Sequence, residues 1–188
     1  MTGEKRFVNE TLTIPYKELL ELMESLELGM KHYYEGLAER FTTPDLQRLW
    51  VMMAEQEETH TRLVRLMRKR SASDRDLQES EMQVNAREYY TINEFLEEYP
   101  RVLARENLTL EKGFEVALAL ESLELTPIYR PFIAKQDKPT RDVLEELLES
   151  EDMHLNILVK AVRRHIDDPD FREFAEEVLQ KNAGSSPA

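Results

Sequence analysis

A short motif of an acid and a histidine occurs twice in this chain of 188 residues, each time within a long stretch of helix-forming residues. The two copies, Glu57–His60 and Glu151–His154, both have the form Glu-x-x-His. Residues three apart lie one turn apart on the same face of a helix, so each copy places a carboxylate beside an imidazole. A further glutamate precedes each motif by 30 residues, Glu27 in the first case and Glu121 in the second. The chain therefore contains the same arrangement of acids and histidine in duplicate.

The duplicated residues lie at positions where the helices of a globular protein carry apolar side chains. Four stretches of the chain have apolar residues at steps of three and four, which predicts one inward-facing stripe on each of four helices. Glutamates and histidines interrupt all four stripes. The stripes are Leu20, Met23, Glu27, Met30, Tyr34, Leu37 and Phe41; Leu46, Leu49, Met53, Glu57, His60, Val64 and Met67; Phe114, Ala117, Glu121, Glu124 and Ile128; and Leu144, Leu147, Glu151, His154, Leu158 and Ala161.

These inward-facing polar side chains predict a metal site. Burying a single unpaired ion costs several kcal/mol, and a domain of this size cannot tolerate that cost at seven positions. Two divalent cations would offset four of the five carboxylate charges, and four-helix bundles hold pairs of metal ions with such ligands. Carboxylates with one imidazole per ion favour iron or manganese, whereas a structural zinc site would need thiolates or more histidines.

Composition excludes several other classes of protein. The chain has no cysteine, which rules out disulfides, zinc-thiolate sites and iron–sulfur clusters. A net charge of −13 argues against nucleic acid as a partner. No apolar run approaches the roughly 18 residues of a membrane span, and residues 1–10 lack the apolar segment of a signal peptide. Five glycines and abundant Leu, Glu and Arg favour an all-α fold. We expect a soluble cytoplasmic protein.

The helical patterns predict one domain, an antiparallel four-helix bundle of the ferritin-like type. A long crossover between the second and third helices is what two antiparallel helix pairs need in this topology. A short helix follows the fourth. The expected domain covers residues 13–181, with a first helix pair at 13–70, the crossover at 71–109, a second pair at 110–166, a terminal helix at 168–181, and loose ends at 1–12 and 182–188.

Local signals place the helix ends. Thr13 with Pro15 indicates the start of the first helix, and Thr109 and Asp168 are expected N-caps of later helices. Within the crossover, Thr91–Tyr99 resembles a short helix capped by Thr91, with Pro100 ending it.

Other signals concern the second and third helices. The second closes with the cations Arg65, Arg68, Lys69 and Arg70, which suit the negative C-terminal end of a helix. Pro127 and Pro131 predict a bend just after Glu124 in the third.

Three stretches carry a resemblance to a known family. Met53-Ala-Glu-Gln-Glu57-Glu-Thr-His60 looks like the second-helix motif of the rubrerythrin family, within the ferritin-like superfamily. Glu121-Ser-Leu-Glu124-Leu-Thr126-Pro-Ile-Tyr129-Arg-Pro-Phe132 is similar to the family pattern Glu-x-x-Glu-x-Thr-x-x-Tyr-x-x-Phe. Glu27 with Tyr34 resembles the first helix of that family. The resemblance covers the four long helices.

The resemblance implies a role for each of five fixed ligands. Glu57 and Glu151 would bridge two iron ions. Glu27 and Glu121 would be terminal ligands on opposite sides of the pair. His154 would hold one ion permanently.

The resemblance also implies a ligand that changes with oxidation state. Glu124 would hold the second iron in the oxidised state and His60 would replace it in the reduced state, since ferric iron prefers an anionic oxygen and ferrous iron accepts neutral nitrogen. Tyr34 and Tyr129 match family tyrosines near the site and would hydrogen-bond ligand carboxylates. Glu124, His60, Tyr34 and Tyr129 are therefore the candidate catalytic residues.

A rubrerythrin-type protein is expected to reduce hydrogen peroxide. Rubrerythrins often carry a rubredoxin domain whose Cys-liganded iron delivers the electrons, but this chain has no cysteine. The electrons are therefore expected to come from an external donor, such as a rubredoxin-like protein. Two alternatives remain: ferroxidation or iron handling with dioxygen, and a non-enzymatic helical module that binds metal. The sequence leaves open the electron donor, the physiological oxidant, manganese in place of iron, assembly as a homodimer, and whether the site is catalytically active.

Overall fold

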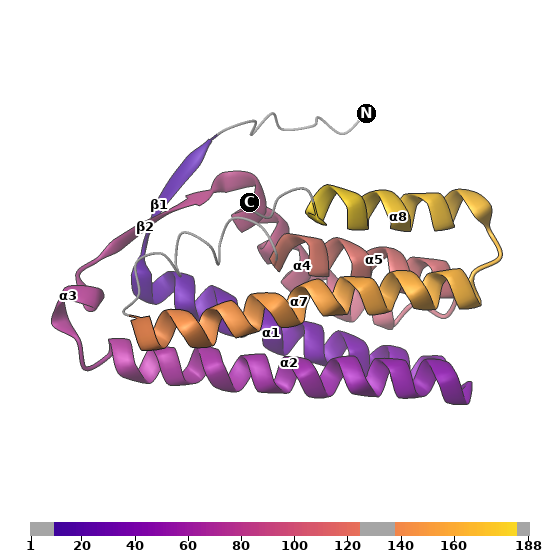
Figure 1. Cartoon of the computed structure of the whole chain (residues 1–188), viewed down its shortest axis with the longest axis horizontal. Helices are drawn as coiled ribbons and strands as arrows, with labels where there is room; N and C mark the ends of the chain where they lie inside the picture. Colours follow the sequence, from indigo (N-terminus) through magenta and orange to yellow (C-terminus); the bar gives the residue numbers. More distant parts are fainter. Residues whose placement is uncertain (1–9, 125–137, 184–188) are drawn as a thin grey trace. The chain divides into compact units, whose positions relative to one another are not determined.

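Helices dominate the chain, as its composition predicts. The computed structural model describes residues 10–124 and 138–183, without the side chains of 123–124, 139–140, 142–152 and 183 (Figure 1). No helix within these ranges is long and apolar enough to span a membrane. The described elements are β1 Thr11–Pro15, α1 Tyr16–Arg40, α2 Pro44–Ser71, α3 Arg75–Gln78, β2 Glu81–Asn85, α4 Ala86–Leu103, α5 Leu110–Glu124, α7 Lys138–His165 and α8 Pro169–Ala183.

The described residues divide into two compact units. The first unit comprises residues 10–38 and 48–103, and the second comprises residues 39–47, 104–124 and 138–183. The all-α fold is confirmed, while the assignment of residues 13–181 to one domain stays a prediction.

In the first unit, the apolar stripes of α1 and α2 form the core. The α1 positions from Leu20 to Leu37 on the predicted stripe are buried, and so are Met53 and Val64 of α2. Ion pairs join the two helices at their margins: Lys31 Nζ lies 2.7 Å from a Glu58 carboxylate oxygen, and Arg65 Nε lies 2.8 Å from one of Glu24. The helical phase predicted from the sequence is therefore correct here.

The predicted start of the first helix at Thr13 is wrong. Residues 11–15 form strand β1, which pairs antiparallel with β2, and α1 begins at Tyr16. Thr13 lies opposite Gln83, and Ile14 is buried. A β-branched residue such as Ile14 suits a half-buried strand, and its partner strand lies about 70 residues away in the sequence. The pattern of one segment does not reveal such a distant partner.

The predicted crossover helix is also wrong in its bounds. Helix α4 starts at Ala86, where the Asn85 side-chain oxygen accepts a hydrogen bond from the Arg87 N–H and so caps the helix. Thr91 is not a cap, because its hydroxyl donates to the carbonyl of Arg87 inside the helix. Pro100 lies within α4 rather than at its end. Packing outweighs the lost backbone bond, since Val102 beyond the proline is buried.

Helix α4 approaches α1 closely at two glycines. A Cβ atom added at Gly29 would lie 2.8 Å from a methyl carbon of Leu96, and one at Gly36 would lie 2.6 Å from a methyl carbon of Leu103. Both separations are shorter than van der Waals contact. The absence of side chains at these positions therefore allows α4 to lie directly against α1.

Glu88 on α4 makes stability depend on pH. One of its carboxylate oxygens is buried and accepts no hydrogen bond from the described residues. Burial raises the pKa of Glu88 from 4.5 to about 7, with Arg87 opposing the shift. The folded chain thus holds this proton more tightly than the unfolded chain, so stability falls as pH rises between these values.

We expect Glu88→Gln to stabilise the protein by about 1 kcal/mol at pH 8 and to have little effect at pH 4.5 or below. A buried group with this change in pKa would contribute about 3 kcal/mol, but Glu88 is only partly buried and solvent screens its charge. Urea denaturation at the two pH values measures the difference. Glu94→Gln, at an exposed position of the same helix, is the control and should show no such trend.

In the second unit, α5 packs on α7 and α8, and α7 packs on α8. Phe114, Leu158 and Ala175 are buried, one from each helix. Two predicted caps are confirmed: the Thr109 hydroxyl accepts the N–H of Lys112, and an Asp168 carboxylate oxygen accepts the N–H of Asp170. The bend predicted after Glu124 falls outside the described residues.

Candidate metal centre

The first unit brings together a glutamate of α1 and a glutamate and a histidine of α2. Glu27 and Glu57 are 0% exposed and His60 is 4% exposed. His60 Nδ1 lies 3.1 Å from Oε2 of Glu57 and 3.6 Å from Oε2 of Glu27. We call Glu27, Glu57 and His60 the first-unit set.

Helical phase explains why these acids are buried while their neighbours are not. Glu57 lies on the stripe of α2 one turn after the buried Met53, whereas Glu58 is rotated toward the helix margin. Glu58 accepts hydrogen bonds from Lys31 and from Arg62, and the bond from Lys31 contributes most to lowering the pKa of that carboxyl. Adjacent glutamates therefore have different surroundings, one in the core and one in surface ion pairs.

The second unit contains a matching pair. Glu121 of α5 and His154 of α7 are each 0% exposed. His154 Nδ1 lies 3.3 Å from Oε2 of Glu121. Their neighbours Leu118 and Leu158 are buried as well, so both polar side chains lie within the apolar interior of this unit. We call Glu121 and His154 the second-unit pair.

Both groups fit the ligand chemistry of a metal ion. Two donor atoms held about 2.1 Å from one ion, at right angles or slightly more, are about 3.0–3.4 Å apart. The separations of 3.1 Å and 3.3 Å between imidazole nitrogen and carboxylate oxygen lie in this range. A metal ion would also supply positive charge at any pH, whereas an imidazole does so only when it is protonated.

A model of the rubrerythrin family matches residues 18–162. The chain belongs to the rubrerythrin family. Both Glu/His groups lie within the matched residues. A search of curated proteins and a search of solved structures each found no match. Membership confirms the resemblance in the sequence and the ferritin-like helical bundle expected from it, and it implies that the protein binds iron.

The remaining ligands expected of a rubrerythrin are only partly described. Glu124 lies in α5 and Glu151 lies in α7, and both side chains are outside the description. Tyr129 lies outside the described residues altogether. The roles of these residues stay predictions, as does the assignment of His60 to the reduced state.

Tyr34, expected near the site, is fully buried two turns after Glu27 on α1. Its ring stacks on that of Trp50 of α2, with 5.9 Å between centroids and 11° between planes. The sequence did not predict this stack, because spacing rules relate residues of one helix and these two rings come from different helices. The stack restricts the ring of Tyr34 to one orientation beside the core.

Proposed function

We propose that this rubrerythrin-family protein is a di-iron oxidoreductase that reduces hydrogen peroxide to water with two electrons from an external donor. In this proposal the iron ligands are the first-unit set, the second-unit pair, Glu124 and Glu151. The observation that carries it is the burial of Glu27 and Glu57 with His60 Nδ1 within 3.6 Å of both. Membership in the family supports iron as the metal.

The surrounding residues favour redox chemistry at a site from which bulk water is excluded. Met23, Met30 and Met53 are 1% exposed or less and flank the acids along their helices. Bound iron would supply the electrons that cleave the O–O bond, and each peroxide would take up two electrons and two protons to give two waters. The carboxylates of Glu27 and Glu57 would hold the ions, and His60 would provide a neutral nitrogen that suits ferrous iron.

Rapid mixing tests the proposal against ferroxidation. The protein is loaded anaerobically with two equivalents of ferrous iron and mixed with peroxide or with dioxygen, and the ferric absorbance in the near ultraviolet is followed. We expect peroxide to oxidise the iron markedly faster. Turnover should then consume peroxide in the presence of a reduced rubredoxin. Faster oxidation by dioxygen would favour iron handling and contradict the peroxidase assignment.

A further inference from the structure

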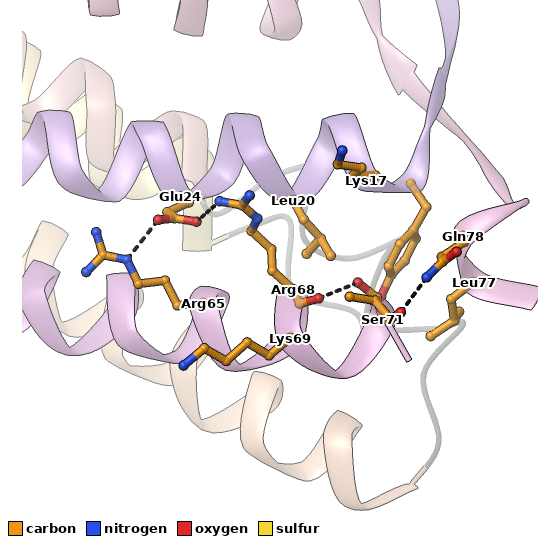
Figure 2. Close-up of a pocket in the computed structure, with 11 residues that line it drawn as sticks. Lys17, Leu20, Glu24, Arg65, Arg68, Lys69, Ser71, Leu77 and Gln78 are labelled. Atoms are coloured by element: carbon orange, nitrogen blue, oxygen red, sulfur yellow. Dashed lines mark hydrogen bonds and ion pairs between the residues drawn. The ribbon is translucent and has the colours of Figure 1, made fainter. Parts of the chain in front are cut away.

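A pocket in the first unit lies away from the Glu/His residues. Its volume is about 650 Å³, and its lining comes from the start of α1, the end of α2 and α3 (Figure 2). Pockets of about 300–1,000 Å³ are typical of small-molecule sites. Glu24 of its lining precedes Glu27 by one helical turn, so the pocket and the first-unit set are neighbours along α1.

The lining is positively charged in a protein whose net charge is −13. It includes the four cations Lys17, Arg65, Arg68 and Lys69 and one acid, Glu24, so four positive charges minus one negative charge leave +3. This local excess of positive charge favours an anionic ligand.

The acid in the lining is already paired with two guanidinium groups. Glu24 accepts a hydrogen bond of 2.8 Å from Arg65 through one carboxylate oxygen and a bond from Arg68 through the other, as Figure 2 shows. Burial alone would raise the pKa of Glu24, but these bonds and charges together lower it. Glu24 therefore stays ionised and holds both arginines at the wall of the pocket. Because its carboxylate is paired with the arginines, it does not compete with an incoming anion for the two lysines.

The two lysines of the lining are available to a ligand. Lys17 is 75% exposed, and its nearest acid, Glu21, is 3.7 Å away. Lys69 makes no ion pair with any carboxylate in residues 10–124 and 138–183 whose side chain is described. Ammonium groups placed in this way can pair with an incoming anion without breaking a buried interaction.

The lining also contains apolar side chains, beside the polar Ser71 and Gln78. The side chains of Tyr16 and Leu20 form part of the wall on α1, and Leu77 of α3 forms part of the opposite wall. In Figure 2, Leu20 lies between the Glu24–arginine group and Lys17, and it is fully buried behind them. Leu77 is only partly buried and Ala72 is exposed, so a fully polar anion would leave both in contact with water, whereas a ligand with an apolar part would cover them.

We propose that this pocket binds a small organic anion with an apolar tail. The anionic group pairs with Lys17 and Lys69, and the tail packs on Leu77 and Ala72. The site differs from the proposed iron centre in both ligand chemistry and residues, so binding does not depend on peroxide reduction.

Calorimetric titration with octanoate tests the proposal on the iron-loaded protein. Octanol has the tail without the charge, and acetate has the charge without the tail. We expect octanoate to bind with one-to-one stoichiometry and at least about tenfold more tightly than either control, with an affinity that falls as ionic strength rises. Equal binding of octanol would show an apolar crevice only, and equal binding of acetate would show a bare anion site. Either result, or no octanoate binding at millimolar concentration, overturns the proposal.

Three variants separate the pocket from general electrostatics. The double variant Lys17→Gln/Lys69→Gln should weaken octanoate binding by about tenfold. Lys112→Gln/Lys160→Gln removes the same charge from a partly exposed and an exposed position in the second unit and should leave binding unchanged. Ala72→Trp fills the pocket from an exposed lining position and should abolish binding while all charges remain. Unchanged melting curves would show that the variants fold. Equal losses in the two double variants would contradict a specific site.

Discussion

Removing iron from the loaded protein with a chelator is expected to lower its melting temperature at pH 8 by about 10 °C. Glu27, Glu57 and Glu121 are fully buried, and without a cation their charges oppose folding. A ligand held at about a thousand times its dissociation constant stabilises the folded state by about 4 kcal/mol. For a chain of this length each kcal/mol shifts the melting temperature by about 2–4 °C. Circular dichroism with and without chelator measures the difference.

A charge-neutral variant separates this effect from loss of packing. Glu27→Gln/Glu121→Gln keeps the volume of both side chains and removes two buried charges, so its metal-free form should melt above the metal-free native protein. The difference in melting temperature between its iron-loaded and metal-free forms should be smaller than in the native protein, because two metal ligands are weakened. Glu58 pairs with Lys31 at the margin of α2, so Glu58→Gln should show the same difference in melting temperature as the native protein. Identical melting temperatures of the native protein with and without chelator would contradict a metal centre.

Helical phase was the part of the fold that the sequence predicted best. Whether Glu27 and Glu57 face inward depends on apolar residues within two turns on either side, such as Met23, Met30 and Met53. That information is local, because a helix repeats every 3.6 residues whatever it packs against. The same rule predicted that Glu121 and His154 of the second-unit pair face inward, and both are buried.

The errors concern contacts between distant segments. Strand β1 exists because Thr11–Pro15 pairs with Glu81–Asn85, and helix α4 extends past Pro100 because Val102 is buried and Leu103 lies against Gly36. Local signals favoured a cap at Thr13 and a stop at Pro100, and tertiary packing outweighed both. No pattern within one segment contains these partners.

The pocket was missed for a related reason. Arg65 and Arg68 suit the C-terminal end of a helix, and the sequence gives no further reason to single them out. In the structure both contact Glu24 of α1, and Leu20 of the same helix lies in the same wall. A cationic pocket arises here from two helices and a short third one, so its residues are scattered over more than 60 positions of the chain.

Replacing Glu57 by alanine is expected to remove iron and to slow oxidation by peroxide about a hundredfold or more. Glu57 is fully buried, its Oε2 lies 3.1 Å from His60 Nδ1, and its proposed role is that of a ligand shared by both ions. Loss of residues that only orient metal ligands costs about 10–100-fold in affinity or activity, so loss of a shared ligand should cost more. Elemental analysis and rapid mixing with peroxide measure the two effects.

The neighbouring glutamate provides a stringent control for this loss. Glu58→Ala removes the same functional group one position along α2, but Glu58 interacts with Lys31 and Arg62 at the helix margin. It should retain its full iron content and the native rate with peroxide. His60→Ala should still bind ferric iron. Its ferrous form should be oxidised slowly by peroxide, because the imidazole is the ligand proposed for the reduced ion. If Glu57→Ala and Glu58→Ala had equal iron content, the inward stripe of α2 would not hold the metal, because burial is what distinguishes these two acids.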